Sequence, residues 1–264
     1  MATRDWYDTP LYYDIIFDAD TPREADFLEA VWQRHAGPGR GRRVLEPACG
    51  SGRLVLELAR RGWRVDGFDA SQPMLDYARE RLAAAGLRAR LWADRLRDFT
   101  APAAGSYDLA HCLVSTFKYL LTEADARACL QRVATALRPG GLFVLGLHLS
   151  EYERTQPDHE RWVAARDGVE VVCNTRTWPA DRRTRLENLR TRLRTRLRVR
   201  REGQTQTQET RWQFRTYDTR QLRALLRSVP ELETVACHDF THDAATEFQL
   251  DGGHLDVVLV LRRR

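Results

Sequence analysis

The stretch Arg43-Val44-Leu45-Glu46-Pro47-Ala48-Cys49-Gly50-Ser51-Gly52 decides how the chain around it is expected to fold. It is a short apolar strand that ends in a glycine-rich turn, and the helical pattern of residues 53–59 follows directly. Glycine adopts positive φ without strain and leaves the backbone open to a ligand, while a helix N-terminus offers free N–H groups to a carboxylate. The stretch therefore predicts a strand–turn–helix unit that holds a nucleotide-like ligand.

The residues of the turn narrow the class of ligand. Dinucleotide-binding folds use G-x-G-x-x-G because a pyrophosphate sits on the helix N-terminus, but Val55 occupies the place of the third glycine. Glu46, at the strand end, would repel a phosphate and suits the cationic amino group of an amino acid. We therefore expect an amino-acid-like ligand, and a dinucleotide-dependent oxidoreductase is disfavoured.

Two further predicted strands also end in an acid. Residues 63–69 read as a strand ending at Asp69, and residues 88–94 as a strand ending at Asp94. Asp69 follows Glu46 by 23 positions (69 − 46), close to the roughly 20-residue step that brings an acid to a ribose diol. Three acids at successive strand ends meet at the edge where open α/β sheets bind ligands, which favours a cofactor site there.

Strand and helix patterns alternate as far as His148. Thr21, with Pro22 and Glu24 after it, reads as the N-cap of a first helix that ends near His35. Further helices are predicted over residues 72–85 and 123–137, and further strands over residues 107–113 and 142–147. The alternation implies a parallel sheet with right-handed crossovers.

After His148 the pattern changes to β. Residues 169–178 read as a strand, and residues 189–200 alternate leucine, threonine or valine with arginine at a period of two, which predicts a long strand. A turn at Glu202-Gly203 would return the chain through residues 204–217 as a hairpin. A helix near residues 219–228 and strands near 232–239 and 255–261 complete the chain. The favoured interpretation of the arginine face of the hairpin is a solvent-exposed surface. The alternative interpretation is a binding site for an acidic or phosphorylated substrate or for an RNA backbone.

The composition of the 264 residues is that of an ordinary globular protein, with 43% hydrophobic and 30% charged residues. The first residues lack the apolar stretch of a secretory signal, so a cytoplasmic protein is expected. Five scattered cysteines without a C-x-x-C pair indicate neither a disulfide framework nor a zinc site, and no metal is expected. The net charge of +5 comes from arginine, with Lys118 the one lysine, so we give it little weight as evidence for nucleic acid.

The pattern E-x-A-C-G-x-G at residues 46–52 resembles the first motif of class I methyltransferases that use S-adenosyl-L-methionine. The resemblance implies an α/β fold with a seven-stranded Rossmann-like sheet, mostly parallel with an antiparallel last strand, plus an antiparallel β insertion after the fifth strand. It implies one methyltransferase domain over residues 1–264, with an N-terminal lid and helix at 1–36 and a β-rich, substrate-side insertion at 150–217.

The resemblance also implies which residues contact the cofactor. Glycines and strand-end residues would hold its methionine end, Asp69 its ribose, Met74 and Asp94 its adenine, and the Leu113 carbonyl would lie near its sulfonium. The full expected set is Glu46, Ala48, Gly50, Gly52, Asp69, Ala70, Met74, Asp94, Arg95 and Leu113.

The sequence indicates catalytic residues less directly, because methyl transfer is an in-line displacement in which positioning supplies most of the rate. His148, at the end of the fifth strand, is the first candidate for a general base, and His111 reads as a core residue. Tyr12 and Tyr13 resemble the lid tyrosines of small-molecule methyltransferases. Four residues after the fourth strand would either line the acceptor pocket or cap a helix: Ser115, Thr116, Lys118 and Tyr119.

The function expected from the resemblance is methyl transfer to an N or O atom of a small molecule, similar to glycine and amino-sugar N-methyltransferases. An RNA or other nucleic-acid methyltransferase is the alternative, although His111-Cys112-Leu113-Val114 replaces the Asn-Pro-Pro-Tyr type of motif used on exocyclic base amines. A non-catalytic protein that binds S-adenosyl-L-methionine is a further alternative. The sequence leaves the acceptor open, and with it the choice between a monomer and a homodimer.

Overall fold

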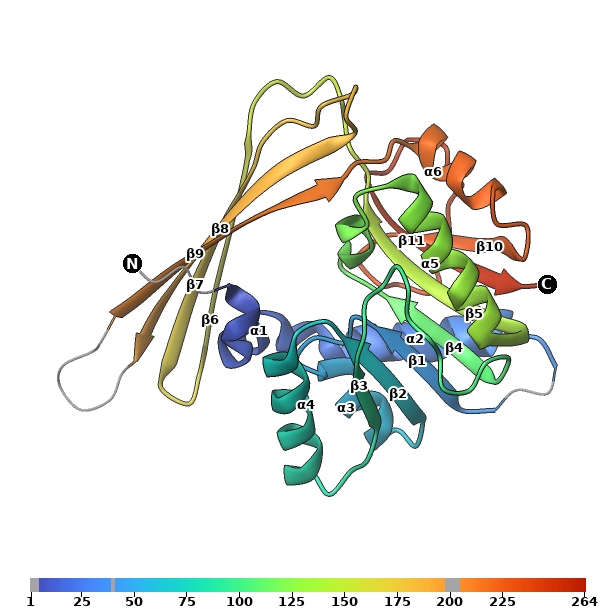
Figure 1. Cartoon of the computed structure of the whole chain (residues 1–264), viewed down its shortest axis with the longest axis horizontal. Coiled ribbons are helices and arrows are strands. Elements are labelled where there is room, and N and C mark those ends of the chain that lie inside the picture. Colours follow the sequence, from blue (N-terminus) through green and yellow to red (C-terminus); the bar gives the residue numbers. More distant parts are fainter. Residues whose placement is uncertain (1–4, 39–40, 198–204) are drawn as a thin grey trace.

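The computed structural model describes residues 5–38, 41–197 and 205–264, which build two separate β-sheets (Figure 1). The larger sheet has seven strands: β1 (Arg43–Pro47), β2 (Arg64–Asp69), β3 (Arg90–Ala93), β4 (Tyr107–Cys112), β5 (Leu137–His148), β10 (Leu232–His238) and β11 (Asp256–Arg263). Their order in space is β10-β11-β5-β4-β1-β2-β3. β11 runs antiparallel to both β5 and β10, while the pairs from β5 to β3 are parallel, so the predicted fold class is confirmed.

Helices cover both faces of the seven-stranded sheet. The helices of the structure are α1 (Pro10–Phe17), α2 (Thr21–His35), α3 (Arg53–Arg60), α4 (Gln72–Ala84), α5 (Glu123–Ala136) and α6 (Thr219–Arg227). Alternate strand residues face opposite layers: Leu45 packs with α5 and α6, and its neighbour Val44 packs with α2, α3 and α4. No helix within the described ranges is long and apolar enough to cross a membrane.

The start of α2 differs from the capping box that the sequence predicts. Asp20 precedes the helix without a side-chain cap, and Thr21 is its first residue. The Thr21 hydroxyl instead accepts a hydrogen bond from Arg53 (3.2 Å), and the Glu24 carboxylate forms an ion pair with the same guanidinium. Arg53 is only 9% exposed, and a buried cation that lost its carboxylate would be strongly destabilising, so Glu24 neutralises it rather than closing a cap.

The fifth strand also begins earlier than the sequence indicates. Arg138-Pro139-Gly140-Gly141 was expected to separate a helix from a strand starting at Leu142, but β5 begins at Leu137, directly after α5. Leu137 pairs with Tyr107 of β4, and the register shifts before the next pair, Leu109 with Leu142. The register shift accommodates the residues Arg138-Pro139-Gly140-Gly141 within the strand, as a β-bulge does.

The smaller sheet is antiparallel, in the order β6-β7-β8-β9, with β6 (Asp158–Arg166), β7 (Val169–Thr177), β8 (Leu186–Leu197) and β9 (Thr205–Arg215). The period-two prediction for β8 is confirmed, since Leu193 and Thr195 are buried and Arg192 and Arg194 are exposed. The sequence did not indicate β6. The expected turn at Glu202-Gly203 lies outside the described residues, as do the other residues between 198 and 204.

The buried face of the smaller sheet packs on the N-terminal segment. Trp6 and Ile15 form a cluster with Val171, Cys173 and Leu193, and the Trp6 ring stacks on Trp212 of β9 with centroids 5.2 Å apart. Figure 1 shows α1 between this sheet and the end of the seven-stranded sheet near α4. The N-terminal segment therefore connects the insertion to the edge where the cofactor site was predicted.

Candidate functional site

A cavity of about 750 Å³ opens at the carboxyl ends of β1, β2 and β3. The loops after these strands supply one wall, the N-terminal segment a second, and the short 3₁₀ helix η3 (Thr116–Tyr119) with the residues after it a third. Its lining includes Asp5, Tyr7, Asp8, Tyr13, Ala48, Gly50, Asp69, Ala70, Asp94, Arg95, Thr116, Tyr119 and Leu120. Seven of the thirteen residues predicted for the site are in this set: Tyr13, Ala48, Gly50, Asp69, Ala70, Asp94 and Arg95.

The glycine turn has the backbone that the sequence predicts. Gly50 and Gly52 both adopt positive φ (52° and 70°), and α3 begins immediately after them. A Cβ atom on Gly52 would lie 2.6 Å from the Cβ of Ala78 in α4, so this glycine is also needed for close packing. Gly50 lines the cavity, and a Cβ atom added to it would lie 3.9 Å from the ring of Tyr13.

Asp69 is fixed by two backbone groups. Its carboxylate accepts hydrogen bonds from the Gly50 N–H (2.9 Å) on one oxygen and from the Ser71 N–H (2.8 Å) on the other. Burial raises the pKa of Asp69, and these two hydrogen bonds oppose that shift. Each carboxylate oxygen has a second lone pair, so the side chain retains one acceptor site on each oxygen for a pair of ligand hydroxyls.

Asp94 is held in a similar way at the next strand end. Its carboxylate accepts from the Arg95 N–H (2.8 Å), the Thr100 N–H (3.1 Å) and the Trp92 indole (3.2 Å). Its own N–H donates to the Asp69 carbonyl (3.1 Å), which joins the two loops. Two of the three acids predicted to bind a cofactor, Asp69 and Asp94, are therefore pre-oriented at one end of the cavity.

Glu46 lies behind the cavity wall rather than in its lining. Glu46 as a residue is 7% exposed, and its Oε2 atom has no hydrogen-bond partner among the described residues. Burial raises its pKa to about 8, although Arg53 opposes the shift. His111 Nε2 lies 3.9 Å from Glu46 Oε2 and is likewise unpartnered in the described ranges. Burial lowers the pKa of His111 to about 3, so this imidazole is neutral and supplies no positive charge to Glu46.

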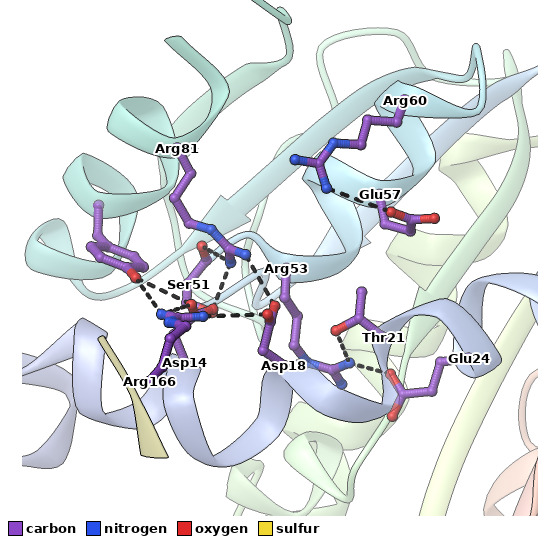
Figure 2. A network of polar contacts seen from close by, with 11 residues as sticks. Asp14, Asp18, Thr21, Glu24, Ser51, Arg53, Glu57, Arg60, Arg81 and Arg166 are labelled. Carbon is purple, nitrogen blue, oxygen red and sulfur yellow. Dashed lines mark hydrogen bonds and ion pairs between the residues drawn. The ribbon is translucent and has the colours of Figure 1, made fainter. Parts of the chain in front are cut away.

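A buried ionic network holds α1 against the glycine turn (Figure 2). Asp14 is fully buried and accepts from the Ser51 hydroxyl (2.9 Å), from Arg81 of α4 (2.5 Å) and from Arg166 of β6 (2.6 Å). Asp18 pairs with the same two arginines at 3.0 and 3.3 Å. The network thus ties the N-terminal helix, the turn, α4 and the smaller sheet together, and no sequence pattern indicated it.

Tyrosine rings cover the other side of the cavity. Burial raises the pKa of Tyr13 to about 12, so at neutral pH it is a neutral phenol above Gly50. The Tyr7 and Tyr119 hydroxyls hydrogen-bond to each other at 2.7 Å and both side chains line the cavity. Tyr7 was missed from the sequence because its segment has no motif of its own. Tyr119 was one of the four residues for which the sequence left open a place in the acceptor pocket or a role in capping a helix.

The remaining predicted residues lie elsewhere. Met74 and Leu113 are buried in the core behind the cavity, and Tyr12 packs in the aromatic cluster of the N-terminal segment. His148 lines a second cavity of about 220 Å³, where its Nδ1 pairs with Asp256. Lys118 lines that cavity too, paired with Glu187 at 2.6 Å.

The sheet order, the glycine turn and the strand-end acids together define the class I methyltransferase fold, as the sequence motif indicated. Residues 44–141 match a family model described as a methyltransferase domain. The resemblance to class I methyltransferases noted in the sequence is therefore confirmed.

Known proteins similar to this chain agree with that class. It is 29% identical over 119 residues to the putative methyltransferase YqeM of Bacillus subtilis, covering 45% of this chain and 47% of that protein. It is 32% identical over 117 residues to glycine N-methyltransferase of Oryctolagus cuniculus, covering 39% and 40%. The solved structure of the sugar N-methyltransferase KedS8 from Streptoalloteichus sp superposes with a TM-score of 0.72 at 18% identity, covering 100% of this chain and 94% of that one. The chain spans about half the length of the curated relatives it matches.

Proposed function

We propose that this chain is an S-adenosyl-L-methionine-dependent methyltransferase that acts on an N or O atom of a small molecule. One observation carries the proposal: Gly50, Asp69 and Asp94 come from separate strand ends and line one cavity of about 750 Å³. Their groups suit an adenosyl amino acid, because Val55 stands where a pyrophosphate-binding turn has its third glycine, and because carboxylates at the strand ends would repel a pyrophosphate.

Each residue has a defined part in holding this cofactor. Asp69 accepts the ribose hydroxyls on its two free acceptor sites. Asp94, whose carboxylate the Arg95 backbone N–H holds in place, accepts from the adenine amino group. Glu46 attracts the cationic amino group, which would compensate its buried Oε2 atom, for which the described residues offer no hydrogen-bond partner. The bound cofactor supplies a methyl group already activated by a positive sulfur.

The chain's contribution to the reaction is then to orient the acceptor and exclude water. Tyr13, a neutral phenol, donates a hydrogen bond rather than taking a proton. We keep His148 as the candidate base for an acceptor that arrives protonated. Its Nδ1 is held by Asp256, which leaves Nε2 to receive the proton. Lys118, which lines the His148 cavity, and Tyr119, which lines the larger one, are neighbours on η3.

A small acceptor fits the site better than a nucleic acid. The cavity volume lies within the roughly 300–1,000 Å³ typical of small-molecule sites. On the arginine face of the hairpin, Glu209 pairs with Arg192 at 2.6 Å and with Arg211 at 2.8 Å, so part of the positive charge is neutralised there. The sugar N-methyltransferase among the structural neighbours supports an amine as the acceptor group.

The test has a binding arm and a transfer arm. S-adenosylhomocysteine should raise the melting temperature strongly while NAD should not, since a ligand that binds only the native state stabilises it by mass action. Methyl transfer from labelled cofactor to a panel of small amines and hydroxyl compounds is then followed by mass spectrometry. No shift with the adenosyl ligand would refute the proposal. Binding without transfer to any member of a broad panel would favour the non-catalytic alternative.

A further inference from the structure

Two histidines and a glutamate, residue types that commonly bind metals, lie together on the opposite side of the sheet from α5, away from the cofactor cavity. His35 lies at the end of α2, His238 at the end of β10, and Glu247 in the loop between β10 and β11. One ligand atom from each lies within 4.8 Å of the other two, and His35 Nε2 is 3.6 Å from Glu247 Oε1. None of these residues lines the 750 Å³ cavity. The cluster therefore needs an explanation of its own.

The hydrogen bond of His238 determines its tautomer. Its side chain is fully buried, and Nδ1 lies 2.8 Å from the Thr246 carbonyl oxygen. A carbonyl only accepts, so Nδ1 carries the proton and Nε2 has a free lone pair. Nε2 is buried and has no hydrogen-bond partner within the part of the chain that the structure describes. Metal-bound histidines are held in this way, with the other ring nitrogen donating to a carbonyl.

His35 also has a buried ring nitrogen that is available to a ligand. Its Nε2 is buried without a hydrogen-bond partner in the described ranges, because the 3.6 Å separation from Glu247 is too long for one. Two residues with buried, unpartnered ring nitrogens thus come together with one carboxylate, and buried polar atoms without a partner are costly unless a ligand satisfies them.

We propose that His35, His238 and Glu247 bind a divalent transition-metal ion, with Zn²⁺ the best match. Zn²⁺ takes imidazole and carboxylate ligands at about 2.0–2.2 Å, which in a tetrahedron places them about 3.3 Å apart. His35 Nε2 and Glu247 Oε1, 3.6 Å apart, are already close to that separation. All three ligand atoms lie within 4.8 Å of one another, so small side-chain movements would bring them to the distances that Zn²⁺ needs. A water would complete the coordination.

The site would fasten an otherwise irregular segment. Residues 239–255, between β10 and β11, contain no helix or strand, and Glu247 lies in their middle. A metal would join this loop to the ends of α2 and β10, elements brought together only by the fold, since His35 and His238 are 203 positions apart (238 − 35). Its role is therefore stabilisation of this corner of the fold, separate from methyl transfer.

One neighbouring cation sets the affinity. Arg34 Nη1 donates to Glu247 Oε1 (3.0 Å) and to the Ala244 carbonyl (2.6 Å). A metal ion has to share the Glu247 carboxylate with this guanidinium or displace the guanidinium from it. Arg34 therefore weakens metal binding, and removing the Arg34 charge should strengthen metal binding.

The test uses the full chain, freed of metal by chelation. Titration with Zn²⁺ against a chromophoric chelator should give one site, and Co²⁺ should give the visible absorption of a tetrahedral complex. His35→Gln and Glu247→Gln should each weaken Zn²⁺ binding at least hundredfold, while Arg34→Gln should strengthen it several-fold. His35 lies at the end of a helix, so we expect His35→Gln to fold. It therefore tests the site even if His238→Gln, at a fully buried position, proves unstable.

His242→Gln is the matched control. His242 is on the same loop and also packs on Phe27, with both ring nitrogens buried and unpartnered among the described residues, but it is not one of the three clustered ligands. Zn²⁺ affinity unchanged by His242→Gln and lost with His35→Gln supports the site. Zn²⁺ binding retained by His35→Gln and Glu247→Gln, or no binding by the wild type, overturns it. Binding of S-adenosylhomocysteine should be the same in every variant.

Discussion

Replacing Glu46 by glutamine should abolish the release of a proton that we expect to accompany cofactor binding in the wild type. With a pKa of about 8, the free protein at pH 7 holds Glu46 protonated over ionised by about ten to one. If the ammonium of S-adenosylhomocysteine binds beside it, the carboxylate must ionise, which costs about 1.4 kcal/mol at this pH. Binding should therefore release about 0.9 proton per site in the wild type and none from this position in Glu46→Gln.

The pH dependence has a definite sign. The raised pKa favours the protonated form of the free protein below pH 8, while the ligand favours the ionised form, so affinity should increase with pH. The expected gain is about ninefold from pH 6 to 7 and about fivefold from pH 7 to 8. In the free protein, the stability contributed by Glu46 is fully present below its unfolded pKa near 4.5 and is lost as the pH rises through about 8.

Calorimetry in two buffers of different ionisation enthalpy measures the released proton directly. The apparent binding enthalpy of the wild type should differ between phosphate and Tris, and that of Glu46→Gln should not. The melting temperature of the ligand-free wild type should also fall relative to the variant between pH 5 and 8. Equal enthalpies in both buffers for the wild type, or the same proton release by the variant, would refute the assigned role of Glu46.

The other predictions concern the ribose contact, the α1 network and the arginine face. Asp69→Ala should weaken S-adenosylhomocysteine binding by about 3 kcal/mol, roughly a hundredfold, because two charge-assisted hydrogen bonds are lost. Calorimetry measures the affinity, with Asp76→Ala as a control at an exposed site. Equal affinities of the two variants would contradict the ribose contact. Asp14→Ala should reduce the free energy of unfolding by about 3 kcal/mol, because two largely buried arginines lose their shared carboxylate. In urea unfolding the control Asp18→Ala, 37% exposed, should lose less than about 1 kcal/mol, and equal losses would show that burial of Asp14 is unimportant. The double variant Arg192→Gln/Arg194→Gln should transfer methyl groups to a small acceptor at the wild-type rate, and a large loss would indicate that this face binds the acceptor.

Much of the fold follows from local patterns. The glycine turn, the strand-end acids and the period-two alternation of β8 were each readable, because they reflect the conformation or exposure of neighbouring residues. The start of α2 was predicted wrongly for the opposite reason. Glu24 satisfies every local rule for a capping box, but a buried Arg53, 29 positions away (53 − 24), takes its carboxylate.

The sequence by itself determined the class of fold, and it predicted the residues proposed to form the cofactor side of the candidate site. Gly50, Asp69 and Asp94 are recognisable because each stands at a fixed place relative to its own strand, and parallel strands bring their carboxyl ends to one edge. Only the tertiary structure decided what covers that edge and what lies far from it. It placed Tyr7 against Tyr119, made Asp14 the junction of four elements, and brought His35 to His238. These contacts join residues at least 37 positions apart, so no local pattern in the sequence could indicate them.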